Sequence, residues 1–219
     1  FLADAGYVVA SMYYRSSAEA HMPSQIIDVK TAIRFLRAHA DQYEIDPERI
    51  GIIGRSAGGH LSALAAMNSD EFESDEWCEF SSKVQACCDM FGPVDFVKLI
   101  EDDEQEMRTN PDFRWKTLEE THAGAVMGGD MATIKERCKQ FCPPYILTTD
   151  MSPMMILHGD CDKLVSCSIS EDFYDKIVER GMDDRTEFYI LNGAGHGTKE
   201  FFQPETKKLI EKFFDKYLK

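Results

Sequence analysis

Short apolar runs alternate with amphipathic segments along most of the chain. The runs are rich in β-branched, aromatic or other large apolar side chains, which is typical of buried strands. Because helix-length segments separate them, they predict βαβ units, a mostly parallel sheet with helices on both faces, and hence an α/β fold. The runs lie at residues 7–13, 49–54, 84–91, 154–157 and 187–191.

The segments between the runs carry apolar residues at helical spacing and predict helices. The helices are expected at residues 23–40, 57–68, 168–180 and 204–218. Residues 96–150 break this order with an acidic stretch and several short helical patterns. We interpret them as an irregular insertion within one domain that spans residues 1–219.

The composition excludes several classes of protein. The chain has 219 residues, of which 43% are hydrophobic and 29% charged, and this is ordinary for a globular protein. A formal net charge of −15 repels phosphate backbones, so we expect no nucleic-acid partner. No apolar run approaches the roughly 18 to 20 residues that a membrane span needs.

The seven cysteines lack the spacing of a disulfide framework or of a zinc site. We therefore expect free thiols, no metal ion and a cytoplasmic location. A secreted protein stays an alternative, because a leader could precede Phe1.

One short motif carries chemistry through its position. Residues 54–58 read Gly-Arg-Ser-Ala-Gly and lie between a predicted strand and a predicted helix. In this context a sharp turn lifts the Ser56 hydroxyl above the sheet edge, and small residues on either side let the strand and helix approach. The pattern predicts that Ser56 is a nucleophile and that the Ala57 N–H forms part of an oxyanion hole.

A serine nucleophile needs a base, and the base needs an orienting carboxylate. His196 follows the last predicted strand in a glycine-rich loop, where a catalytic imidazole would project, whereas His158 suggests a structural role. Asp162 lies 34 residues before His196 and is the expected acid. Asp160, in the same loop, and Asp95, after the third predicted strand, remain alternatives.

Further stretches support these assignments: residues 6–15, 23–36, 45–60, 91–96, 158–162 and 193–197. Together they resemble the α/β-hydrolase superfamily, and more closely the small serine esterases related to hormone-sensitive lipase and to bacterial acetylxylan and feruloyl carbohydrate esterases. The similarity covers nearly the whole chain apart from about residues 98–140. It is specific for the superfamily and says little about the substrate.

The resemblance implies that Ser56, Asp162 and His196 form a catalytic triad. It implies hydrolysis of a small-molecule carboxylic ester, with a small acyl or carbohydrate-linked group, through an acyl-enzyme and without a cofactor.

The same resemblance implies that the insertion at about residues 96–150 is a small cap over the pocket. Phe113, Trp115 and Met127 could line it, with core packing as the alternative for each. Arg55, beside the nucleophile, and Trp115 are expected to contact the substrate.

The sequence departs from the family at its start. The family places a second oxyanion N–H in an early glycine-rich loop, and this chain has no such loop. Residues 1–6 read as the last turn of a helix that Gly6 caps. We therefore expect about 50–80 residues upstream of Phe1, carrying the second donor and a strand that fills a gap between residues 7–13 and 49–54.

Two alternative functions remain. One is an amide or peptide hydrolase of the same fold, similar to an arylformamidase or a dipeptidyl peptidase. The other is a catalytically impaired hydrolase-fold binding protein. A homodimer is compatible with each of them.

Overall fold

Four parallel strands form one sheet in the computed structural model, which describes residues 1–219. The strands are β1 (Gly51–Arg55), β2 (Ala86–Met90), β3 (Met154–Gly159) and β4 (Thr186–Leu191). Their order in the sheet is β1-β2-β3-β4, and every neighbouring pair is parallel. The predicted α/β fold is confirmed, and the carboxyl ends of all four strands meet at one edge.

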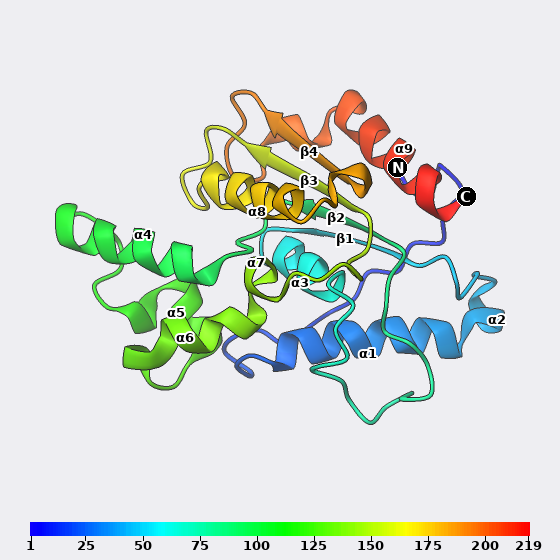
Figure 1. Ribbon diagram of the computed structural model, residues 1–219, viewed down its shortest axis with the longest axis horizontal. Helices are drawn as coiled ribbons and strands as arrows, with labels where there is room; N and C mark the ends of the chain where they lie inside the picture. The colour runs from blue at the N-terminus through cyan, green and yellow to red at the C-terminus, as the bar shows by residue number, and fades with distance from the viewer.

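Helices cover both faces of the sheet (Figure 1). Side chains of β2 and β3 alternate between the faces, as the period of a strand requires. One face packs against α1 (Ser24–Ala38), α3 (Ala57–Ala65) and α8 (Cys167–Glu179) through Cys87, Met154 and Ile156. The other face packs against α9 (Pro204–Leu218) through Cys88, Met155 and Leu157.

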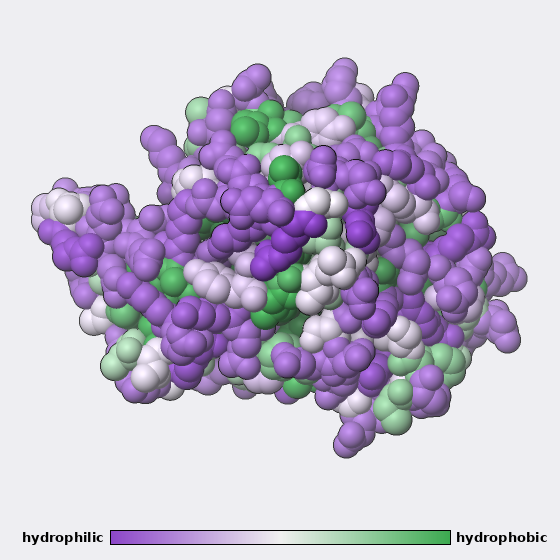
Figure 2. All heavy atoms as spheres, viewed as in Figure 1, coloured by the Kyte–Doolittle hydropathy of each residue, from purple (hydrophilic) through white to green (hydrophobic).

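These helices begin and end within about three residues of the predicted bounds. A separate short helix, α2 (Ala40–Tyr43), follows α1. Polar residues cover most of the face shown in Figure 2. None of the helices combines the length and the apolarity that crossing a bilayer demands.

Residues 96–146 form a lobe that projects beyond the sheet (Figure 1). Its longest helix, α4 (Phe96–Thr109), begins close to the end of β2 and runs away from the sheet. The shorter helices of the chain are α2 (Ala40–Tyr43), α5 (His122–Met127), α6 (Ile134–Cys138) and α7 (Pro143–Ile146), with 3-10 turns η1 (Leu118–Glu120), η2 (Met131–Thr133), η3 (Lys139–Phe141), η4 (Asp183–Arg185) and η5 (Lys199–Phe202).

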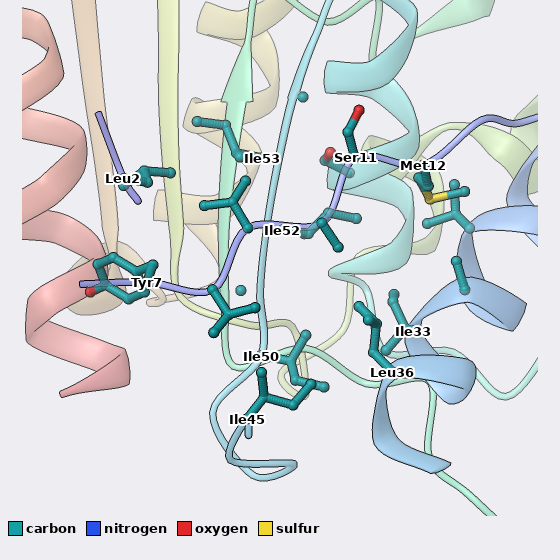
Figure 3. A pocket seen from close by; sticks show the side chains of 18 of the residues that line it. Leu2, Tyr7, Ser11, Met12, Ile33, Leu36, Ile45, Ile50, Ile52 and Ile53 are labelled. Carbon is teal, nitrogen blue, oxygen red and sulfur yellow. The ribbon is translucent and has the colours of Figure 1, made fainter. Parts of the chain in front are cut away.

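The predicted strand at residues 7–13 is wrong. The segment is extended, but residues 8–14 make no backbone–backbone hydrogen bond. Figure 3 shows that the chain from Tyr7 to Met12 runs across the direction of β1 rather than along it. A strand needs a neighbour that pairs with its N–H and C=O groups, and at this crossing angle β1 does not provide one.

A cavity of about 610 Å³ lies between this segment, β1, α1 and α3. Its lining is mostly apolar and includes Ile33, Leu36, Ile50 and Ile52 (Figure 3). β1 is consequently an edge strand whose outer side faces a cavity, at the position of the expected gap.

Arg37, at the end of α1, ties the amino ends of two strands together. Its buried guanidinium donates to the carbonyl of Pro47 at 2.9 Å and to the carbonyls of Ser81 and Lys83. Pro47 precedes β1, and the other two residues precede β2. Arg37 therefore fixes the level at which the two strands enter the sheet, and with it the level at which they end.

We expect Arg37→Met to lower the free energy of unfolding by about 2–4 kcal/mol, because it removes the charged donor that three carbonyls share. Urea denaturation measures the change. Arg180→Met, at an exposed position after α8, is the matched control and should cost less than about 0.5 kcal/mol. Equal stability of the two variants would contradict the role of Arg37.

Candidate active site

Ser56 lies at the sharp turn between β1 and α3. Its backbone has φ 53° and ψ −121°, a conformation that costs a non-glycine residue about 1–3 kcal/mol. The surrounding hydrogen bonds hold it there: the Ser56 N–H donates to the Met90 carbonyl at 2.9 Å, and the His60 N–H donates to the Ser56 carbonyl at 3.0 Å. The turn predicted from the motif is present.

The strand and the helix approach so closely that only glycine fits at two positions. A Cβ atom on Gly54 would lie 2.1 Å from the Gly58 carbonyl oxygen. A Cβ atom on Gly59 would lie 2.3 Å from an Asp89 carboxylate oxygen and 2.9 Å from the Met90 carbonyl oxygen. All three distances are below van der Waals contact, so these glycines permit the turn.

Three predicted residues come together at the carboxyl edge of the sheet. The Ser56 Oγ lies 2.8 Å from His196 Nε2, and His196 Nδ1 lies 2.7 Å from Asp162 Oδ2. Ser56 follows β1, Asp162 follows β3 and His196 follows β4. The ring of Phe91 packs edge-on against the His196 ring, with the ring centroids 4.8 Å apart, and limits the orientation of the imidazole.

Asp162 is held as a carboxylate. Burial alone would raise its pKa, but hydrogen bonds from His158, His196 and the N–H groups of Val165 and Leu164 outweigh burial and hold the pKa well below its usual range. The ionised Asp162 accepts a hydrogen bond from the Nδ1–H group of His196. Nε2 of the neutral ring then carries no proton and can accept the proton of the Ser56 hydroxyl.

His158 is a member of this network that the sequence reasoning treated as structural. Its side chain is fully buried, and its Nε2 lies 3.0 Å from the Val165 carbonyl and 3.4 Å from Asp162 Oδ2. Its Nδ1 lies 2.7 Å from the Ser170 hydroxyl. With Nε2 as donor, His158 supports the same carboxylate oxygen that faces His196. A histidine at the end of a buried strand, four residues before the acid, is the signal that sequence reasoning could have used.

The two alternative acids lie elsewhere. Asp95 caps α4 by accepting from the N–H groups of Val97 and Lys98. Asp160 accepts from the Gly193 N–H at 2.7 Å and ties the loop after β3 to the loop after β4. Neither carboxylate bonds to His196, so the geometry favours Asp162.

Ala57 is the first residue of α3, where a backbone N–H has no intrahelical acceptor and the helix end carries partial positive charge. Its N–H is therefore available to a developing oxyanion. The second oxyanion donor stays a prediction.

Arg55 and Trp115, which were both expected to contact the substrate, lie in different parts of the structure. Arg55 lies 5.4 Å above the Phe202 ring and lines a cavity of about 290 Å³ beside α9. Trp115 belongs to the lobe and packs with Phe113 at 5.5 Å. Met127 is 5% exposed and belongs to the apolar core, so core packing is the correct interpretation for it.

No group of three or more histidine, cysteine or acidic side chains converges in a way that could hold a metal ion.

Comparison with proteins of known structure defines the fold. A truncated carbohydrate esterase from gut microbiota matches 94% of this chain and 72% of its own, with a TM-score of 0.77 and 31% sequence identity. A bifunctional GH43-CE protein of Bacteroides eggerthii matches 94% of this chain and 26% of its own, with a TM-score of 0.78 and 30% identity. The fold is that of the α/β hydrolases.

The family follows from the sequence. The BD-FAE family model matches residues 1–177, and the chain belongs to this family. The probable carboxylic ester hydrolase LipM of Mycobacterium tuberculosis is 31% identical over 178 residues, which cover 80% of this chain. The chain spans 38% of the length of LipM.

Asp89 is a buried carboxyl beneath the turn. It is 0% exposed, its Oδ1 accepts from the Gly92 N–H at 2.9 Å, and its Oδ2 has no hydrogen-bond partner. Burial raises the pKa of Asp89 to about 6, against the opposing effects of the His158 charge and the Gly92 N–H. At neutral pH the folded protein therefore holds a poorly compensated charge.

This charge makes stability depend on pH. An unfolded aspartate ionises near about pH 3.9, so the folded state binds the extra proton between about pH 4 and pH 6, and stability falls as pH rises through that window. Asp89→Asn is expected to raise the free energy of unfolding by about 1–3 kcal/mol at pH 8 and by much less at pH 4. Denaturant titration at both pH values measures it. Asp41→Asn, at an exposed position, is the control; a gain independent of pH would contradict the prediction.

Proposed function

We propose that this chain hydrolyses carboxylic esters of small molecules through an acyl-enzyme on Ser56. The observation that carries the proposal is the unbroken hydrogen-bonded series from Ser56 through His196 to Asp162, with contacts of 2.8 and 2.7 Å. The names of similar proteins, a carbohydrate esterase and a probable carboxylic ester hydrolase, support the same reaction class.

Acylation follows from the proton positions. The Ser56 Oγ attacks the ester carbonyl carbon while its proton moves to His196 Nε2. Asp162 holds the Nδ1 proton and stabilises the imidazolium that forms. The carbonyl oxygen becomes negative and faces the Ala57 N–H at the start of α3. When the tetrahedral intermediate collapses, the C–O bond to the alcohol breaks and His196 returns its proton to the leaving oxygen.

Deacylation repeats these steps with water. His196 removes a proton from water as the water attacks the acyl-Ser56 carbonyl, and then protonates Oγ as the acid leaves. The strained Ser56 backbone keeps Oγ at the same place in both halves of the reaction, because φ and ψ of the turn fix the Cβ direction.

Two further features complete the proposal. The lobe of residues 96–146 acts as the cap, because α4 begins close to the end of β2 and extends beyond the edge that carries the triad. The proposed location is the cytoplasm, where thiols stay reduced. It is supported by seven free cysteines, of which Cys78 and Cys161 are exposed.

Ser56→Ala is expected to reduce hydrolysis of p-nitrophenyl acetate by at least about 10⁴-fold, because the variant lacks the hydroxyl that forms the acyl intermediate beside His196. Release of p-nitrophenol measures the rate. A fluorophosphonate should label the unaltered protein at Ser56 and leave the variant unlabelled, as peptide mapping would show. Ser17→Ala, at an exposed position, is the matched control and should react normally.

The same assay separates the alternatives. Activity that survives Ser56→Ala would overturn the nucleophile. Faster cleavage of p-nitroacetanilide than of the ester would indicate an amide hydrolase. An unaltered protein that neither reacts nor becomes labelled would favour the binding protein.

His158→Gln is expected to lower kcat for p-nitrophenyl acetate about tenfold or more with less than a twofold change in KM. The reason is that Asp162 keeps its charge but loses a donor that fixes the oxygen facing His196. Steady-state kinetics measure both constants.

His60→Gln is the matched control for this variant. His60 is also a buried histidine, but its Nε2 meets the Phe141 carbonyl and does not contact Asp162. It should lose stability with a smaller loss of kcat. Equal losses of kcat in the two variants would show that His158 only supports the fold.

A further inference from the structure

The two loops that carry Asp162 and His196 are tied together by a side chain outside the triad. Asp160, the first residue after β3, accepts from the N–H of Gly193, in the loop after β4, at 2.7 Å. We propose that Asp160 is a positioning residue that keeps the acid and the base of the triad within hydrogen-bond distance. The proposal rests on the proposed ester hydrolysis and adds to it a residue that acts through His196.

The regular sheet stops short of the triad. The ladder between β3 and β4 ends where Gly159 pairs with Leu191. Asp162 lies three residues beyond the end of β3, and His196 lies five residues beyond the end of β4. The ladder therefore fixes where the two loops begin, but it does not fix the 2.7 Å contact between Asp162 Oδ2 and His196 Nδ1.

The loop after β4 needs further contacts to hold one shape. Residues 193–197 read Gly-Ala-Gly-His-Gly, and Gly193 and Gly197 have φ of 73° and 66°. Glycine loses more conformational freedom on folding than other residues, so a loop of this composition is ordered only where other groups restrain it. Contacts along this loop therefore decide where the His196 imidazole can lie.

Backbone hydrogen bonds join the two loops next to the Asp160 contact. The Cys161 N–H donates to the Ala194 carbonyl at 3.0 Å. The Asp160 N–H donates to the Leu191 carbonyl at 3.4 Å. The loops approach so closely that a Cβ atom on Gly159 would lie 2.2 Å from the Ala194 carbonyl oxygen. These backbone bonds do not depend on the side chain of residue 160, so its replacement should leave the fold in place.

The Asp160 contact lies close to both triad residues along the chain. It lies two residues before Asp162 and three residues before His196. Two side-chain hydrogen bonds join these loops: one is the Asp162–His196 bond itself, and the other is the Asp160–Gly193 bond. Without the second bond, the start of the glycine-rich loop is free to move away from β3. A displacement of about 1 Å in a reacting group is enough to slow catalysis markedly.

Asp160 is expected to act as a hydrogen-bond acceptor rather than as a charge. Its side chain is exposed, so water and salt screen its charge, whereas the bond to the Gly193 N–H has a fixed length and direction. An asparagine carries a carbonyl oxygen at the same position and can accept the same bond. Asp160→Asn therefore removes the charge and keeps the contact, and Asp160→Ala removes both.

The kinetic test compares these two variants in the hydrolysis of p-nitrophenyl acetate. We expect Asp160→Ala to lower kcat about tenfold with less than about a twofold change in KM, because the ester still binds while the base is misplaced. Asp160→Asn should stay within about threefold of the unaltered chain. Asp183→Ala, at an exposed position before β4, is the matched control and should change kcat by less than about twofold. Circular dichroism at the assay temperature checks that each variant is folded.

A second measurement does not need catalysis. The proton on His196 Nδ1 should give a downfield resonance in the NMR spectrum, because its bond to Asp162 protects it from exchange with water. His196→Gln removes this proton and so assigns the resonance. We expect the resonance to broaden or vanish in Asp160→Ala and to persist in Asp160→Asn and in Asp183→Ala.

An unchanged kcat or an unchanged resonance in Asp160→Ala would overturn the positioning role, as would the absence of the resonance from the unaltered chain. Equal losses in Asp160→Ala and Asp160→Asn would overturn it too, because the charge of Asp160 would then matter and its hydrogen bond would not. A resonance that depends on Asp160, in a chain that hydrolyses no ester, would support the positioning role and overturn the proposed hydrolysis.

Discussion

The close approach of α3 to the ends of β1 and β2 is the constraint on which the site depends. There is no room for a side chain at Gly54 or Gly59, because each would strike backbone or carboxylate atoms within 2.3 Å. This approach forces Ser56 into its positive φ and places the first turn of α3 directly after the Ser56 hydroxyl. It also places Asp89 under the turn, where its burial costs stability. Favourable free energy from the rest of the fold therefore offsets the strain of the backbone that orients the Ser56 hydroxyl.

Most of the fold could be predicted because the sheet is parallel. Strands covered on both faces appear as continuous apolar runs, and the four observed strands were recognised in this way. Residues 7–13 show the limit of the method. Their composition suits a strand, yet Val8, Val9 and Tyr13 are exposed and the backbone has no ladder partner. The apolar pattern of a segment indicates that it is buried and suits an extended backbone. It does not indicate which other strand will pair with it.

The site divides in the same way. Ser56 and His196 could be predicted because local sequence specifies the turn and the loop that carry them. The acid could be narrowed to three aspartates, and only the fold shows that Asp162 alone among them bonds to His196. His158 lies only four residues before Asp162, but the sequence does not show that its ring turns toward the carboxylate, and the fold does.

The separation along the chain between the reacting groups has a consequence for biogenesis. Ser56 and His196 are 140 residues apart, and the sheet that unites them is built from strands joined by long crossovers. Such non-local pairings form late, because the entropy of closing each loop must be overcome before the contact contributes. A partly folded chain thus exposes a serine with no base beside it. The reactivity proposed for Ser56 therefore requires that the last strand has joined the sheet, so folding itself would serve as the activation step.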